Sequence, residues 1–216
     1  PSRSLIGDHP CVFRYGTGEP GSADLTSWHR LRTDLYVESG LITRDEIDPA
    51  SGAFLDQYDD YSVHLLAAND DGVDIGCWRM ITPGPGQTLP VTDLFGIEVR
   101  PNAWESSGSA ILPAYRKSTV SLGFYRALFT LAEERGFENM YGIVEQAFLP
   151  AAVRFGLPIE VISEPRFVFN ADNVATLLSY RDGVFVRWML NSVAYTAGVV
   201  LLGTVVAAMC GYALAK

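Results

Sequence analysis

The chain has 216 residues and a formal net charge of −9 at pH 7. This length is enough for one domain with a substantial core plus an appendage. The acidic balance argues against general nucleic-acid binding, which depends on clustered Lys and Arg side chains. The three cysteines are far apart and have no histidine at ligand spacing, so they predict neither a structural zinc site nor a disulfide framework. His64 falls in an apolar run, where a packed histidine is the favoured interpretation over a catalytic one.

The first 54 residues predict one helix between two irregular stretches. Residues 1–23 are rich in Gly, Pro and Ser without a sustained period, which predicts an irregular N-terminal arm. From Asp24 or Ser27, apolar residues recur at helical spacing and predict a helix that ends near Gly40. Residues 43–54 are polar and contain turn formers, so we expect a linker there.

Residues 55–81 predict a β-hairpin, because runs of β-branched and aromatic residues flank the turn-forming cluster at 69–72. Arg79 lies within the otherwise apolar second strand. An unpaired guanidinium is costly to bury, so Arg79 requires carboxylate partners. Asp56 and Asp59, which precede the first strand, are near enough in sequence to supply them.

The second half of the chain alternates between helical and strand patterns. We expect a loop at 82–102, a strand at 107–112, a helix from Ser118 or Thr119 to Gly136, a strand at 137–144, a short helix at 146–155 and a strand at 159–169 interrupted by Pro165. Such an order predicts an α/β or α+β fold with one mixed central sheet and helices on both faces.

The C-terminal end has a different composition. From Trp188 to Ala215 there are 28 residues without a charged side chain, more than the roughly 20 needed to cross a bilayer. We therefore expect a folded domain over 24–182 and a single transmembrane segment over 183–216, which resembles one helix of a sugar ABC transporter permease. Two explanations stay open: the segment anchors a cytoplasmic domain to the inner membrane, or it is a fragment joined from another gene.

Asp56, Asp59, Arg79 and Glu105 are the polar residues that we expect in one site. In a functional interpretation the cluster orients a polar substrate, and Glu105 accepts a proton from an amine nucleophile. In a structural interpretation it is an ion-pair network at the end of the sheet, and both interpretations stay open. The sequence has no Gly-x-Ser-x-Gly nucleophile motif, and Gly84-Pro85-Gly86 lacks the Lys and the helix of a phosphate loop.

Four short motifs occur together in the order of one known family. They are Arg32 with Tyr36, Asp56-Gln57-Tyr58-Asp59, Arg79 within Gly76-Cys77-Trp78-Arg79-Met80, and Trp104-Glu105-x-Ser107. With this combination, residues 28–165 resemble the bacterial acyl-homoserine lactone synthases, the autoinducer synthases of quorum sensing. The related N-acyl amino acid synthases share much of the pattern.

The resemblance implies a GNAT-like fold and a specific acyl transfer. A fatty acyl group would move from acyl carrier protein to the amine of S-adenosylmethionine, and ring closure would release methylthioadenosine, with no permanently bound cofactor and no metal. The implied catalytic residues are Glu105 and Arg79. The implied substrate-binding residues are Arg32, Tyr36, Asp56, Asp59, Trp104 and Ser107. Because acyl carrier proteins are acidic, we expect a basic docking face at Arg116, Lys117 and Arg126.

The sequence also departs from the family. Gly108 stands where the family has Arg after Trp-Glu-x-Ser, and we expect Gly108→Arg to be tolerated. This gap keeps open an N-acyl amino acid synthase or another N-acyltransferase with a different amine, as well as a non-enzymatic domain that binds acyl carrier protein or an acyl ligand. No Gly-x-Gly follows Tyr115-Arg116 to hold the coenzyme A pyrophosphate, which favours a carrier-protein donor.

Overall fold

The computed structural model describes residues 2–6, 9–18, 23–116, 118–150, 159–169 and 171–179. The described strands are β1 (Ser2–Ile6), β2 (His9–Gly18), β3 (Ser62–Ala68), β4 (Asp74–Ile81), β5 (Ala103–Ile111), β6 (Asn139–Glu145), β7 (Glu160–Val161), β8 (Arg166–Val168) and β9 (Ala171–Ser179). The described α-helices are α1 (Ala23–Glu38), α2 (Pro90–Phe95) and α3 (Val120–Glu134). Short 3-10 turns lie at Arg44–Glu46, Asp59–Tyr61, Pro113–Tyr115 and Gln146–Phe148.

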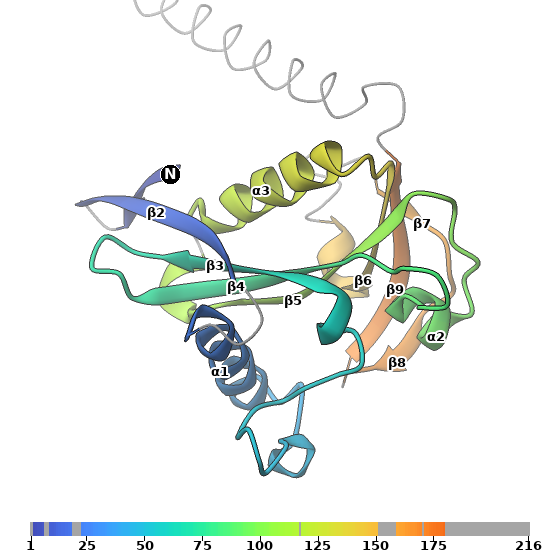
Figure 1. The fold of residues 1–216 in the computed structure, drawn as a ribbon, viewed down its shortest axis with the longest axis horizontal. Helices are drawn as coiled ribbons and strands as arrows, with labels where there is room; N and C mark the ends of the chain where they lie inside the picture. The colour runs from blue at the N-terminus through green and yellow to red at the C-terminus, as the bar shows by residue number, and fades with distance from the viewer. Residues whose placement is uncertain are drawn as a thin grey trace, which may run out of the picture. The chain divides into compact units, whose positions relative to one another are not determined.

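The strands form one mixed sheet with the order β1-β2-β3-β4-β5-β6-β9-β7, and β8 pairs with β9 (Figure 1). Neighbouring strands from β1 to β5 are antiparallel, whereas β5 and β6 are parallel. A parallel pair requires a crossover connection, and α3 provides it between β5 and β6. The predicted mixed sheet is therefore confirmed.

Helices α1 and α3 cover opposite faces of the central strands (Figure 1). The alternation of side chains along β4 shows this directly, because successive residues of a strand point to opposite faces. Cys77 packs in a buried cluster with Trp28 of α1. Its neighbour Trp78 instead contacts Phe124 and Tyr125 of α3, with ring centroids 5.6 and 5.0 Å away. The prediction of helices on both faces is confirmed.

Several local predictions are also confirmed. Helix α1 ends just before Gly40, whose φ of +72° suits the end of a helix. The hairpin forms as β3 and β4, and α3 follows Thr119. The segment expected at 159–169 is interrupted as predicted, with β7 and β8 on either side of Pro165.

The N-terminal arm predicted at 1–23 is wrong, because β1 and β2 form a hairpin there. Pro10, Gly16 and Gly18 interrupt the alternation in β2 and hide its strand formers from a composition argument. Pairing with the edge of β3 makes this segment a strand, since the last five residues of β2, from Arg14 to Gly18, pair with β3.

Three further elements differ from the predictions. The loop expected at 82–102 contains α2, which starts with Pro90 in its first turn and ends at Gly96 with φ +69°. Strand β5 begins at Ala103 rather than at 107, and thus includes both Trp104 and Glu105. Strand β9 was not predicted, although its residues from Asn173 to Leu178 are all buried.

The predicted transmembrane segment at 183–216 lies outside the described residues, as does the second half of the helix expected at 146–155, which begins with the 3-10 turn Gln146–Phe148. Among the residues that the structure does describe, no helix has both the length and the apolar character needed to cross a membrane.

Candidate active site

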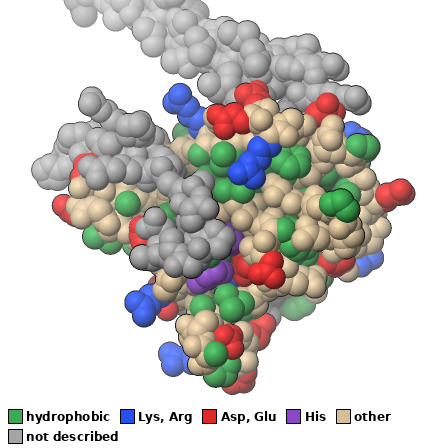
Figure 2. All heavy atoms as spheres, in the orientation of Figure 1, with side chains coloured by type: hydrophobic (Ala, Val, Ile, Leu, Met, Phe, Trp, Pro, Cys, Tyr) green, Lys and Arg blue, Asp and Glu red, His purple; other side chains and the backbone are tan. Residues whose placement is uncertain are grey.

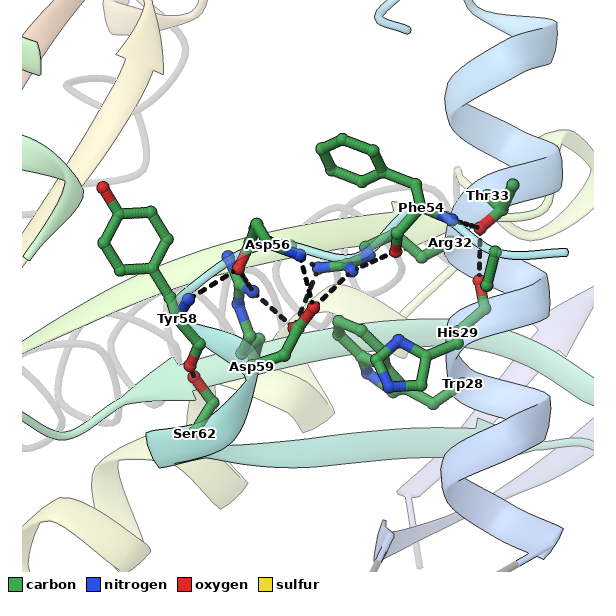
Figure 3. Close-up of polar contacts among 12 residues, drawn as sticks. Trp28, His29, Arg32, Thr33, Phe54, Asp56, Tyr58, Asp59 and Ser62 are labelled. Carbon is green, nitrogen blue, oxygen red and sulfur yellow. Dashed lines mark hydrogen bonds and ion pairs between the residues drawn. The ribbon is translucent and has the colours of Figure 1, made fainter. Parts of the chain in front are cut away.

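A cluster of four charged side chains lies where α1, β4 and the segment before β3 meet (Figure 3). Arg32 on α1 binds Asp59 through two nitrogens, with Nη1–Oδ1 at 3.2 Å and Nη2–Oδ2 at 2.9 Å. Arg79 on β4 donates from Nη1 to Asp56 Oδ1 at 2.6 Å and also to Asp59 Oδ1. The carboxylate partners that Arg79 requires are therefore Asp56 and Asp59, as the sequence predicted.

Asp59 is the centre of this cluster. Besides the two guanidinium groups, it accepts hydrogen bonds from the backbone N–H of Asp56 and lies 3.3 Å from His64 Nε2. Burial alone would raise the pKa of Asp59. The hydrogen bond with His64 and the charges of Arg32 and Arg79 outweigh burial and hold the pKa of this carboxyl well below its usual value. Asp59 is consequently ionised at neutral pH.

His64 is packed and hydrogen-bonded, as the apolar run around it predicted, and it also belongs to the cluster. It pairs directly with Arg79 across the β3–β4 hairpin, so its side chain lies on the same face of the sheet. Its ring also packs on Trp28, at a centroid distance of 4.4 Å. The register of the predicted hairpin was the signal that could have identified this residue.

Ser107 and Gly108 of β5 lie next to Arg79 of the cluster. Arg79 Nη2 donates to Ser107 Oγ at 3.2 Å. The pairing of β4 with β5 then shifts, and Gly108 adopts a φ of +63°, as in a β-bulge. A Cβ atom on Gly108 would lie 3.1 Å from Arg79 Cβ and 3.3 Å from Trp28 Cζ2. The expectation that arginine is tolerated here is wrong, because the backbone is left-handed and neighbouring side chains fill the space.

Glu105 lies two residues before Ser107 and therefore on the same face of the sheet. Its side chain is buried, and Oε2 accepts a hydrogen bond from the backbone N–H of Val91 in α2 at 3.0 Å. Burial raises the pKa of Glu105 to about 8, although the Val91 hydrogen bond and the charge of Arg79 oppose the shift. A carboxyl group with a pKa near neutrality is suited to exchanging a proton with an amine.

Two of the expected substrate-binding residues are not members of the charged cluster. Trp104 is fully buried on the opposite face of the sheet, where its ring packs edge-on against Phe129 of α3 at 6.2 Å. The strict alternation along β5 places it there, so Trp104 is a core residue and not part of the charged cluster. Tyr36 follows Arg32 by one helical turn and flanks the cluster, with its ring 6.3 Å from that of Phe54. Burial raises the pKa of Tyr36 to about 12.

The expected carrier-protein docking residues are on the surface where the structure describes them. Arg116 and Arg126 are exposed, and Arg116 Nε donates to the carbonyl of Ile111 at 3.0 Å. Lys117 lies outside the described residues. On the face drawn in Figure 2, basic side chains lie singly among acidic and apolar ones. The docking role therefore stays a prediction.

The parallel pair β5–β6 opens next to the bulge. Its pairing runs from Ala103 and Asn139 to Ser106 and Gly142, whereas β5 continues to Ile111 and β6 to Glu145. Beyond this point the two strands no longer form a common ladder. Backbone groups at such an opening can bind an extended, amide-containing ligand in the manner of an added strand.

Comparison with known proteins identifies the fold. A family model described as an acetyltransferase (GNAT) domain matches residues 31–126. Comparison of the sequence with curated proteins gives no significant match. Among solved structures, the chain is similar to the CoA-dependent acyl-homoserine lactone synthase BjaI with MTA, with a TM-score of 0.63, 22% sequence identity, and coverage of 76% of this chain and 79% of that one.

Two other solved structures have a similar fold. The acyl-homoserine lactone synthase LasI aligns with a TM-score of 0.60 and 19% identity over 78% of this chain and 89% of that one. FeeM, an N-acyl amino acid synthase from uncultured soil microbes, aligns with a TM-score of 0.57 and 12% identity over 79% of this chain and 94% of that one. The resemblance to acyl-homoserine lactone synthases that the motifs predicted is thus confirmed in three dimensions, and the chain has the fold of the GNAT acetyltransferases.

Proposed function

We propose that this chain is a GNAT-type N-acyltransferase that moves a fatty acyl group from acyl carrier protein to the amine of S-adenosylmethionine and so forms an acyl-homoserine lactone. The observation that carries this proposal is Glu105, a buried carboxyl with a pKa of about 8. It lies on β5 beside the charged cluster and just before the opening between β5 and β6. The similarity to BjaI, whose structures contain MTA or SAM with isopentyl-CoA, supports S-adenosylmethionine as the acceptor. The choice of acyl carrier protein over coenzyme A as the donor rests on the missing Gly-x-Gly after Tyr115-Arg116.

The chemistry requires a base, because an amine attacks a thioester only after it loses its proton. Glu105 takes this proton, directly or through one water molecule. The amine nitrogen then bonds to the acyl carbon, the C–S bond breaks, and a proton of the attacking nitrogen passes to the leaving sulfur, so that the carrier thiol is released. Backbone N–H groups of β5 beyond Ser106 are suited to stabilise the negative charge that develops on the thioester oxygen. Attack of the substrate carboxylate on its own side chain closes the lactone and expels methylthioadenosine.

In this proposal the charged cluster shapes the amine site. The guanidinium groups of Arg32 and Arg79 are bound within the chain and almost completely buried, with 1% and 3% of their side chains exposed. Asp56 is more accessible, with 22% of its side chain exposed. Its carboxylate is suited to attract a cationic acceptor such as S-adenosylmethionine.

A second candidate is acyl transfer to a different amine, for example an amino acid. Gly108 favours it, since the cation that the family pattern places at this position is missing from the cluster. The similarity to FeeM also keeps this candidate in view.

Incubation of the purified full chain with labelled acyl carrier protein or acyl-coenzyme A, combined with S-adenosylmethionine or mixed amino acids, tests the proposal. We expect mass spectrometry to detect acyl-homoserine lactone and methylthioadenosine with the carrier-protein donor. An acylated amino acid would support the second candidate, and the absence of a product with every combination would refute both.

Replacement of the base tests the mechanism. We expect Glu105→Gln to lower kcat by about 100-fold or more, the scale of a lost general base. The matched control is Glu98→Gln, which makes the same change at an exposed position in the loop before β5. Equal activity of the two variants would remove Glu105 from the role of base.

A further inference from the structure

Asp93 is an exposed residue of α2 whose carboxylate accepts hydrogen bonds from three side chains. Its Oδ2 accepts hydrogen bonds from Tyr58 Oη at 2.7 Å, Thr88 Oγ1 at 2.8 Å and Gln57 Nε2 at 3.2 Å. Two of these donors come from the segment before β3, about 35 residues earlier in the chain. An exposed carboxylate is normally hydrated, so three protein donors on one oxygen indicate a fixed connection between two parts of the structure.

The same short helix also holds the proposed base. Helix α2 has six residues, too few to be stable without tertiary contacts. The backbone N–H of Val91 points inward to Glu105, whereas the side chain of Asp93, two residues later, reaches outward to Tyr58. A movement of α2 at Asp93 would therefore displace the hydrogen-bond donor on Glu105.

Tyr58 connects Asp93 to the charged cluster. Its backbone N–H donates to Asp56 Oδ1 at 3.0 Å, and its ring lies 5.9 Å from the guanidinium carbon of Arg79. Figure 3 shows its side chain directed away from α1, on the far side of Asp56. Since Arg79 also binds Ser107, the contacts form a closed circuit that leads from Glu105 through α2, Tyr58 and the cluster back to β5.

We propose that Asp93 is a positioning residue for acyl transfer: it fastens α2 to Tyr58 and thereby keeps the Val91 N–H on the carboxyl group of Glu105. This inference rests on the proposed function, since it assigns Glu105 as the base. The negative charge of Asp93 also contributes to the raised pKa of Glu105. Among the described residues, Arg79 on β4 is the other charged group that acts on Glu105, and Tyr141 is the cross-strand neighbour of Glu105 on β6.

Three variants separate fastening from charge. Asp93→Ala removes the acceptor and the charge, Asp93→Asn keeps an acceptor oxygen but removes the charge, and Tyr58→Phe removes only the hydroxyl donor. Asp60→Asn is the matched control, because it makes the same charge change at an exposed position in the same segment as Tyr58.

The first measurement needs no substrate. The amide proton of Val91 in an NMR spectrum reports its hydrogen bond to Glu105, and its shift follows the ionisation of that carboxyl group. We expect Asp93→Ala and Tyr58→Phe to move this resonance upfield and to speed its hydrogen exchange. Asp93→Asn should retain its position but lower the pH midpoint of its titration, and Asp60→Asn should match the wild type.

The second measurement is the rate of acyl transfer. A small misplacement of a catalytic group lowers turnover strongly, so we expect Asp93→Ala to reduce kcat about tenfold or more while KM changes less than about twofold. Asp93→Asn should restore most of kcat, with the acidic limb of the pH profile shifted to lower pH. An unchanged Val91 resonance and unchanged kcat in Asp93→Ala would overturn the inference. If the wild type forms no product, the proposed function fails instead, and the NMR result alone decides whether Asp93 holds α2.

Discussion

Substitution of Asp59 by Asn gives a quantitative test of the charged cluster. The change keeps the size of the side chain and one acceptor oxygen but removes the negative charge. In the native protein this carboxylate lies against Arg32, Arg79 and His64. The variant would leave two buried guanidinium groups with Asp56 as their remaining carboxylate in the cluster.

The expected magnitude follows from the burial of these groups. Removal of one partner from a buried ion pair costs about 3–5 kcal/mol, because the remaining charge stays uncompensated. The Asp59 side chain is 10% exposed, so solvent screens the interaction little. The amide oxygen of Asn retains part of the hydrogen bonding, and we therefore expect a loss of about 3 kcal/mol in the free energy of unfolding.

Urea unfolding of the full chain, followed by tryptophan fluorescence, measures this loss. Trp28 is a suitable reporter, since its ring lies 4.4 Å from the guanidinium carbon of Arg32. Asp60→Asn is the control and should change the free energy of unfolding by less than about 0.5 kcal/mol, as surface substitutions usually do. A loss of less than about 1 kcal/mol in Asp59→Asn would contradict the view that this carboxylate neutralises buried charge.

Three further predictions concern other parts of the site. The pKa of Glu105 is raised from 4.5 to about 8, so the free energy of unfolding should fall as pH rises between these values. Over the same range kcat/KM should rise, up to about pH 8, because the base loses its proton. Glu105→Gln should remove both pH dependences. Gly108→Ala should lower the free energy of unfolding in urea by about 2–3 kcal/mol, whereas Gly136→Ala should lower it by roughly 1 kcal/mol. Both glycines have a left-handed backbone, but only a Cβ atom at Gly108 would contact neighbouring atoms. Equal losses would exclude the close contacts as the cause. Replacement of Arg116 and Arg126 by Ala should raise KM for acyl carrier protein by about threefold or more at low salt. The KM for an acyl-pantetheine donor should not change. An equal rise of KM for both donors would argue against docking.

The sequence by itself determined the elements whose signals are local. Helix α3 follows from an apolar period of about 3.6, and the β3–β4 hairpin follows from runs of β-branched and aromatic residues on both sides of a turn-forming cluster. These signals act over a few positions. The requirement of Arg79 for carboxylates was also local, since a buried guanidinium without a partner is costly in any fold.

The tertiary structure decided what depends on distant pairing. Strand β2 forms because it pairs with the edge of β3. The register of β5 places Glu105 on the face of the cluster and Trp104 on the opposite face, in the core. The left-handed φ of Gly108 arises from a shift in pairing between β4 and β5. Asp93 meets Tyr58 because α2 packs beside a segment 35 residues away in sequence. No local period encodes such contacts, because they form only when the whole sheet sets the register of its strands.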